Sequence, residues 1–329
     1  MSTGLLNHYP RLLADIGGTY ARFALEVTPG VLEAIHVLQC ADFASLSAAM
    51  SDYLMRVAHR KIDHVALGMA NPVNGDQVQM TNNHWTFSIE ETRCRMGLSS
   101  LVVINDFTAL ALALPLLPRH ELMQLGGEAP VDGAAIALIG PGTGLGVSGL
   151  LPSIQGYVAI AGEGGHVSFS PFDEEEWRVW QYARARFNHV SAERLLSGTG
   201  LALIYEALTS PLNLSAECLT AEEITQRALD GGCDQCYRSV QMFLAMLGTA
   251  ASNLALTLGA RGGVYLGGGI VPRLGHLILS SALRSRFEDK GRFRDYLAPI
   301  PIYVIRSPYP ALFGASVALT KYLEGTEHA

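Results

Sequence analysis

The chain has 329 residues, of which 49% are hydrophobic and only 16% are charged, so most of it must fold around a buried core. A formal net charge of −7 without a long basic run argues against nucleic acids and anionic membrane surfaces as partners. Five cysteines without framework spacing fit a reducing compartment, so we expect a cytoplasmic protein.

The first third of the chain alternates short strands and helices. Leu12–Cys40 predicts three strands in a meander, and apolar residues at helical spacing between Phe43 and Val57 predict an amphipathic helix. The next elements predicted are a buried strand at His64–Ala70, a short helix at Ser88–Met96 and a buried strand at Leu101–Asp106.

The rest of the chain is mainly helical after a glycine-rich strand region. The predicted helices are Glu174–Phe187, Ala192–Leu208, Ala221–Asp230, Tyr237–Leu258 and a last one at about Ala311–Glu324. Two late strands are expected at Val264–Leu266 and Ile302–Ile305. Ser239–Ala260 carries no charge, but its polar residues favour a buried central helix over a membrane span. The N-terminus shows no signal-peptide pattern.

A glycine turn lies between the first two predicted strands. The residues from Leu12 to Arg22 read Leu-Leu-Ala-Asp-Ile-Gly-Gly-Thr-Tyr-Ala-Arg, which predicts a hairpin. Gly17 and Gly18 would let the backbone approach a phosphate, and we expect at least one of them to need a positive φ. Asp15 could hold the magnesium ion of a nucleotide. The alternative is a plain Gly-Gly hairpin with a solvated Asp15.

Two later glycine clusters favour the phosphate interpretation. Gly140–Gly146 repeats the strand, Gly/Thr turn, strand pattern, and Gly267–Gly269 follows a buried strand. Gly140–Gly146 does not fit a P-loop, since no Gly-Lys-Ser/Thr follows it. It is a poor dinucleotide fingerprint too, because a strand rather than a helix comes next. Two such hairpins far apart in the sequence suggest two related lobes gripping one nucleotide.

Several polar residues suit transfer of a phosphoryl group to an alcohol. Asp106 ends a buried strand and is the best general-base candidate, although it could instead cap the following helix. Glu163 and His166 lie in a Gly-rich loop and suit vicinal sugar hydroxyls, or else half of a metal site. Glu193 and Asn82 are two further polar candidates. Glu193 could instead cap a helix, and Asn82 could be a simple turn residue.

Cys233 and Cys236 form the one Cys-x-x-Cys pair in the chain. They could be a metal or redox pair. No second pair and no histidine at finger spacing accompanies them, and they lie where a helix is expected to start. A structural or incidental role is therefore the favoured interpretation.

Taken together, these motifs resemble the sugar kinase/Hsp70/actin ATPase superfamily and, within it, the bacterial glucokinase family. The resemblance runs in order from about Leu12 to about Leu323. The segments that narrow it are Met80-Thr-Asn-Asn-His-Trp85, Ile104-Asn-Asp-Phe107, Gly162-Glu-Gly-Gly-His-Val167, Ser191-Ala-Glu-Arg-Leu-Leu-Ser-Gly198 and Phe287-Glu-Asp-Lys-Gly-Arg-Phe293.

The resemblance implies an α/β fold of two ribonuclease-H-like, actin-like ATPase lobes with a central cleft. We expect residues 1–110 and the C-terminal helix 311–329 to form a small lobe, and residues 111–310 a large one. The implied activity is ATP-dependent phosphorylation of the 6-hydroxyl of glucose, a first step of glycolysis, with ATP and Mg²⁺ and no nucleic acid or membrane partner. We also expect a homodimer.

The resemblance also assigns roles to residues. Asp106 is the catalytic base and Asp15 the Mg²⁺ ligand. The expected sugar ligands are Asn82, Asn105, Asp106, Glu163, His166 and Glu193. The expected nucleotide ligands are Ala14, Asp15, Ile16, Gly17, Gly18, Thr19, Gly140, Gly142, Thr143, Gly144, Gly267, Gly268 and Gly269.

The chain departs from the family pattern at two positions, and three other functions are alternatives. Tyr20 stands at a usual Asn position, and Ser168 stands where many relatives carry an Asp, which puts support of His166 in doubt. Val167–Trp177 lacks the cysteines of the ROK branch, so zinc is not expected. The rivals are a kinase for another hexose or amino sugar, a non-catalytic sugar-binding regulator, and an actin- or chaperone-like ATPase.

Overall fold

The computed structural model describes residues 8–58, 61–154, 156–210 and 217–327. The chain divides into two compact units. Unit 1 comprises Met1–Leu117 with Ser307–Ala329, and unit 2 comprises Pro118–Arg306. Each unit is described by itself.

Unit 1 is built on a five-stranded sheet in the order β3-β2-β1-β4-β7. The first three strands, β1 (Arg11–Ile16), β2 (Tyr20–Thr28) and β3 (Val31–Gln39), form the predicted antiparallel meander. β4 (His64–Met69) and β7 (Ser100–Asn105) join in parallel beside β1. The same order defines the ribonuclease-H-like sheet that the family resemblance implies.

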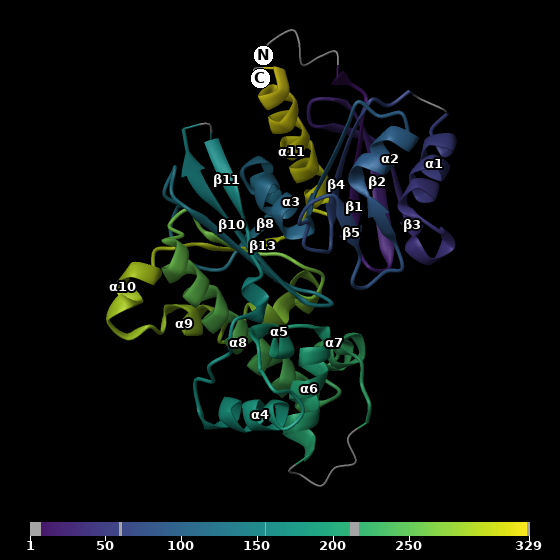
Figure 1. Ribbon diagram of the computed structural model, residues 1–329. Coiled ribbons are helices and arrows are strands. Elements are labelled where there is room, and N and C mark those ends of the chain that lie inside the picture. The colour runs from purple at the N-terminus through teal and green to yellow at the C-terminus, as the bar shows by residue number, and fades with distance from the viewer. Residues whose placement is uncertain (1–7, 59–60, 155, 211–216, 328–329) are drawn as a thin grey trace. The chain divides into compact units, whose positions relative to one another are not determined.

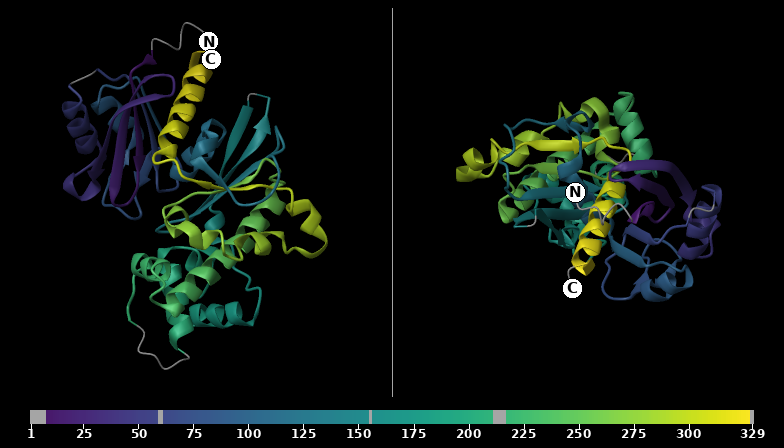
Figure 2. Two further views of the ribbon diagram at one scale, coloured as in Figure 1. Left: turned by 180° about the vertical axis from the view of Figure 1, so that it is seen from behind. Right: turned by 90° about the horizontal axis from the view of Figure 1, so that it is seen from above.

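Both faces of this sheet are covered, which explains why β1 reads as a nearly continuous apolar run. Leu12, Ala14 and Ile16 point into a core that includes α1 (Leu46–Arg56), while Leu13 points to the opposite face. There it meets Leu312, Ala315 and Leu319 of α11 (Pro310–Glu327). α3 (Asp106–Ala113) packs against α11 and β4. Figures 1 and 2 show α11 running beside this sheet.

A small hairpin interrupts the predicted strand and helix order of unit 1. Its strands are β5 (Gln77–Gln79) and β6 (Thr86–Ser88), and α2 (Ile89–Arg95) follows. Three-residue strands are too short to give a clear alternation, so the sequence did not predict them. The connecting loop carries Asn82 and ends at Trp85, which is only 1% exposed and donates from Nε1 to the Phe43 carbonyl at 3.0 Å.

Unit 2 repeats the strand order of unit 1 and adds one strand. Its sheet is β11-β10-β9-β12-β13-β8. β9 (Ile136–Pro141), β10 (Leu145–Ser153) and β11 (Gly156–Ala161) form an antiparallel meander, and β12 (Val264–Leu266) and β13 (Ile302–Ile305) continue in parallel. β8 (Leu122–Gln124) pairs antiparallel with β13. The expected structural duplication is therefore present.

Several helices of unit 2 pack against the long α8 (Asp234–Leu258) (Figure 1). α8 is long and apolar enough to cross a membrane by length and composition, but 67% of its apolar window is buried inside the protein. It is the buried central helix that the sequence predicts. The other helices of this unit are α4 (Glu174–Arg184), α5 (Ala192–Leu195), α6 (Gly198–Thr209), α7 (Ala221–Leu229), α9 (Leu283–Glu288) and α10 (Arg294–Leu297).

The single helix predicted over Ala192–Leu208 is wrong. The chain forms two helices, α5 and α6, because the Ser197 hydroxyl accepts from the Gly200 N–H at 3.1 Å and starts a new helix. Short 3₁₀ turns complete the described elements, at Cys40–Asp42, Leu114–Leu116, Arg119–Glu121, Gly164–His166, Val271–Ile278 and Gly291–Phe293.

Candidate functional site

The first glycine loop joins β1 to β2 as a tight turn. The Gly17 N–H donates to the Tyr20 carbonyl at 2.9 Å. The expected positive φ is wrong, because neither Gly17 nor Gly18 has one. Close approach explains Gly18 instead: a Cβ there would lie 2.8 Å from the Asn82 carbonyl oxygen. The loop of Asn82 therefore lies directly against Gly18.

Asp15 lies at the end of β1 with its carboxylate turned to Arg22, whose Nη1 donates to Oδ2 at 3.0 Å. Burial raises the pKa of Asp15 above its ordinary value, and the Arg22 guanidinium opposes that rise. The Asp15 side chain keeps 21% of its surface exposed. A carboxylate that is partly dehydrated and partly open is suited to a further cation.

The junction of β7 and α3 holds Asn105 and Asp106. Asn105, not Asp106, caps the helix, because its Oδ1 accepts from the N–H groups of Phe107 at 2.9 Å and Thr108 at 3.1 Å. Asp106 lies in the first turn of α3, and its Oδ1 accepts from the Phe107 N–H at 2.8 Å. The positive end of the helix favours the ionised carboxylate.

Asn71 links these segments and was missed by the sequence reasoning. Its carbonyl accepts from Asn105 Nδ2 at 3.4 Å. Its Oδ1 accepts from the Thr81 N–H at 3.1 Å and the Thr81 hydroxyl at 2.7 Å, one residue before Asn82. The available signal was an Asn-Pro pair directly after a buried strand. Asn71 thus ties Asn105 to the loop that carries Asn82.

In unit 2 the second and third glycine clusters lie side by side. The Gly142 N–H donates to the Gly144 carbonyl at 2.8 Å, and the Gly267 N–H donates to the Ile139 carbonyl at 2.9 Å. Gly268 has a φ of +76°, and a Cβ there would collide with the Pro141 carbonyl. The structure therefore brings Gly140–Gly144 and Gly267–Gly269 together, as one nucleotide site would require.

A cavity of about 590 Å³ opens beside Gly269. It lies between α7 and the 3₁₀ turn at Val271–Ile278. Its volume is large enough for a nucleoside. Its lining residues are Ala221, Glu222, Glu223, Thr225, Gln226, Leu229, Gly269, Ile270 and Arg273.

The three candidate sugar ligands of unit 2 gather around the second glycine loop. Glu193 Oε2 accepts from the Leu145 N–H at 3.0 Å and lies 2.5 Å from where a Gly144 Cβ would stand. The backbone at Gly165 lies against the Leu145 carbonyl. Glu163 and His166, which lie before and after Gly165 in the sequence, are exposed, and their Oε2 and Nε2 atoms are 4.0 Å apart.

The helix-capping alternative for Glu193 does not hold, because Ser191 caps α5. Ser168 is turned to His189, whose Nε2 lies 2.9 Å from the Ser168 hydroxyl. Tyr20 is 43% exposed.

The cysteine pair serves as a helix cap. Cys233 Sγ accepts from the Cys236 N–H at 3.3 Å at the start of α8. Burial and the neighbouring Cys233 raise the pKa of the Cys236 thiol to about 12, so it is a poor nucleophile. Within the described ranges, no three or more His, Cys, Asp or Glu side chains gather to hold a metal.

Comparisons with known proteins show the family of the chain. The glucokinase family model matches residues 12–322. A glucokinase of Chromobacterium violaceum is 56% identical over 98% of this chain and 93% of its own length. One of Neisseria meningitidis is 55% identical over 96% of both chains. The crystal structure of a glucokinase from an Antarctic psychrotroph is 36% identical, with a TM-score of 0.86 over 95% of this chain and 99% of that one. The chain belongs to the glucokinase family.

Proposed function

We propose that the protein transfers the γ-phosphoryl group of ATP to the 6-hydroxyl of glucose, giving glucose 6-phosphate and ADP. The observation that carries this is the contact between Glu193 and Leu145 in unit 2. It joins a group of candidate hydroxyl ligands to a loop of the kind that binds phosphate. A site that accepts both a polyol and a phosphate chain is what sugar phosphorylation needs.

Asp106 is assigned the role of general base. In this role its carboxylate accepts the proton of the 6-hydroxyl as the oxygen attacks phosphorus. Its position in the first turn of α3 places the carboxylate at the positive end of the helix dipole, which attracts negative charge. Asn105 has its oxygen committed to capping, so its remaining Nδ2 hydrogen is the group that it offers to a sugar oxygen.

Glu163, His166 and Glu193 are assigned to the sugar ring. Carboxylates accept strong hydrogen bonds from hydroxyl groups, and an imidazole can donate to one oxygen while it accepts from another. Glu193 accepts from Leu145 through Oε2, so its second oxygen is the one assigned to a hydroxyl. Asn82 is assigned a supporting contact on the unit 1 side.

The glycine loops are assigned to the phosphates and the cavity beside Gly269 to the nucleoside. The donor set at Asp15 fits Mg²⁺, which prefers carboxylate, phosphate and water oxygens. Asp15 would hold this ion, which neutralises charge on the phosphates when bound. Arg22 already holds Asp15 Oδ2 in place.

The same proposal extends to the setting of the enzyme. Residues 1–110 with 311–329 would act as the small lobe and residues 111–310 as the large one. We propose a cytoplasmic homodimer that feeds glucose into glycolysis. The five cysteines, which lack framework spacing, support a protein of the reducing cytosol.

A coupled assay of ADP release across a panel of hexoses tests this function. Glucose should show the highest kcat/KM, because a buried polar group left unpaired by a missing or inverted hydroxyl costs transition-state binding. Galactose, mannose and N-acetylmannosamine are the comparison substrates. Equal kcat/KM for glucose, galactose and N-acetylmannosamine would reject glucose as the preferred substrate while leaving a sugar kinase in place.

A further inference from the structure

We propose that a second pocket in unit 2, between α8 and the segment of residues 164–170, binds a neutral molecule of single-ring size. The ligand is mostly apolar with one amide or carbonyl group, and its binding tightens the binding of sugar. The pocket has a volume of about 260 Å³, just below the usual range for drug-sized ligands. The proposal of tighter sugar binding rests on the proposed function; the pocket itself does not.

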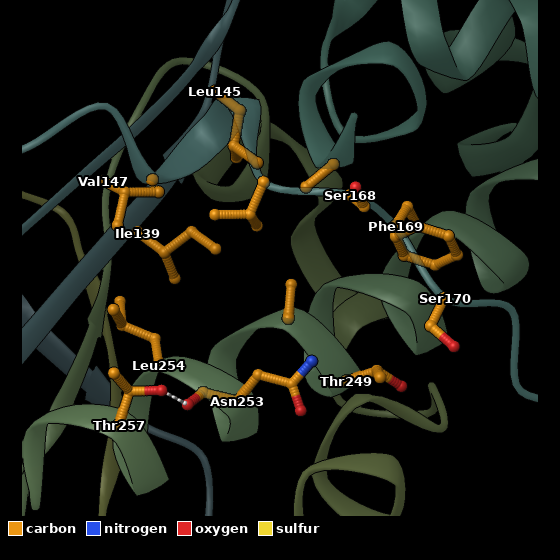
Figure 3. A pocket seen from close by; sticks show the side chains of 14 residues that line it. Ile139, Leu145, Val147, Ser168, Phe169, Ser170, Thr249, Asn253, Leu254 and Thr257 are labelled. Carbon is orange, nitrogen blue, oxygen red and sulfur yellow. Dashed lines mark hydrogen bonds between the residues drawn. The ribbon is translucent and has the colours of Figure 1, made fainter. Parts of the chain in front are cut away.

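The walls of this pocket are mostly apolar (Figure 3). Ile139 and Val147 come from β9 and β10, Phe169 closes the opposite side, and Leu254 rises from α8. No charged side chain lines the pocket among the described residues. The full lining is Ile139, Leu145, Val147, Gly164, Val167, Ser168, Phe169, Ser170, Ala192, Thr249, Ala250, Asn253, Leu254 and Thr257. Such walls favour a neutral ring over an ion.

Asn253 is the polar group that gives the pocket a chemical preference. Figure 3 shows its carboxamide extending from α8 toward the pocket. The hydroxyls of Thr249 and Thr257 are already directed to the helix carbonyls of Ala245 and Asn253, and Thr249 also accepts from Arg286. An amide can donate and accept at once, so it pairs best with another amide.

The pocket shares its wall with the candidate sugar site. Gly164 follows Glu163 directly, and the Leu145 that lines the pocket donates its N–H to Glu193. Val167, beside His166, is 60% exposed at the pocket rim, and its carbonyl accepts from the Ala192 N–H at 2.8 Å. A ligand that fills the space would contact Gly164 and Val167 and restrict the motion of the neighbouring Glu163 and His166. Sugar would then lose less conformational entropy of the protein when it binds, so it would bind more tightly.

Calorimetry with benzamide tests the pocket on the intact protein without sugar. Benzamide should bind saturably, and toluene and benzoate should each bind at least about threefold more weakly, because one lacks the amide and the other is charged. Asn253→Leu should reverse the preference between benzamide and toluene. Ala250→Phe should abolish binding of both by filling the space. Asn188→Leu changes an exposed asparagine of the same unit outside the pocket and is the matched control.

The coupling is tested by the glucose KM at saturating benzamide. It should fall about fivefold, and saturating glucose should also tighten the binding of benzamide, because coupling between two binding sites is reciprocal. Equal benzamide binding in the wild type and Ala250→Phe, or no binding at all, overturns the pocket. Benzamide binding with an unchanged glucose KM overturns the coupling. If the wild type binds benzamide but does not phosphorylate glucose, the result counts against the proposed function and not against the pocket.

Discussion

The two glycine loops follow one plan but are supported by different groups. In unit 1, the loop at Gly17–Thr19 has a backbone carbonyl, that of Asn82, directly behind Gly18. In unit 2, the loop at Gly140–Gly146 has a flexible carboxylate, that of Glu193, behind Gly144. The two loops join equivalent strands of the two sheets, β1 to β2 in unit 1 and β9 to β10 in unit 2.

This difference indicates that the two loops differ in rigidity, although they share the same topology. A backbone neighbour cannot turn away, so the first loop has one geometry, suited to holding phosphate. A side-chain neighbour can rotate, so a change at Gly144 in the second loop can move the Glu193 carboxylate. Four predictions test or sharpen this contrast.

The largest effect is expected at Asp106, which only unit 1 supplies. Asp106→Asn should lower turnover by ~10²–10⁴-fold, because the amide cannot accept the proton. The glucose KM and the thermal midpoint should change little, since the amide oxygen can still accept from Phe107 N–H. Steady-state kinetics measure this effect. A variant that kept more than half of the wild-type turnover would show that Asp106 is not the base.

The next effect tests the rigid support of the first loop. Gly18→Ala would place a Cβ 2.8 Å from the Asn82 carbonyl oxygen, whereas the nearest atom to a Gly17 Cβ is the Tyr20 carbonyl oxygen at 3.4 Å. The steric clash in Gly18→Ala should cost about 1–3 kcal/mol and distort the loop. Nucleotide binding should therefore weaken at least about fivefold. Gly17→Ala is the matched control and should be mild. Calorimetry with an ATP analogue decides, and equal affinities in the two variants would contradict the contrast.

The flexible support of the second loop predicts a smaller and different defect. In Gly144→Ala the new Cβ would displace the Glu193 carboxylate, which can rotate away. The glucose KM should therefore rise about threefold to tenfold, as for loss of one hydrogen bond, while nucleotide affinity falls less. Glu193→Gln should give a similar glucose KM. If Gly144→Ala weakened nucleotide binding as much as Gly18→Ala does, the two loops would be equally rigid.

The smallest effect concerns Asp15 and pH. Its pKa is raised in the folded chain, so the folded chain binds this proton more tightly than the unfolded chain does. The free energy of unfolding then falls as pH rises from the ordinary aspartate value through the raised one. Asp15→Asn removes that loss, so its stability relative to wild type should increase between pH 4 and pH 7. Urea unfolding at both pH values measures it; a wild-type advantage that grows with pH would refute the assignment.

Local patterns were enough to predict most of the fold. The apolar run at Leu12–Ile16 and the Gly-Gly turn after it predict two paired strands, because strand periodicity and turn chemistry act between near neighbours. The uncharged stretch from Ser239 predicts α8 for the same reason. The break between α5 and α6 was missed, because helical spacing continued across Ser197 while the cap formed there.

What the sequence determined by itself was the set of chemical groups and the order in which strands, loops and helices supply them along the chain. Only the tertiary structure decided which groups meet: Asn82 behind Gly18, Asn71 beside Asn105, Glu193 on Leu145, and a pocket behind residues 164–170. The three residue pairs are 34 to 64 positions apart in the sequence, and the pocket brings together residues as far apart as Ile139 and Thr257. Periodicity carries no information over such separations, because packing of whole helices and strands sets those distances.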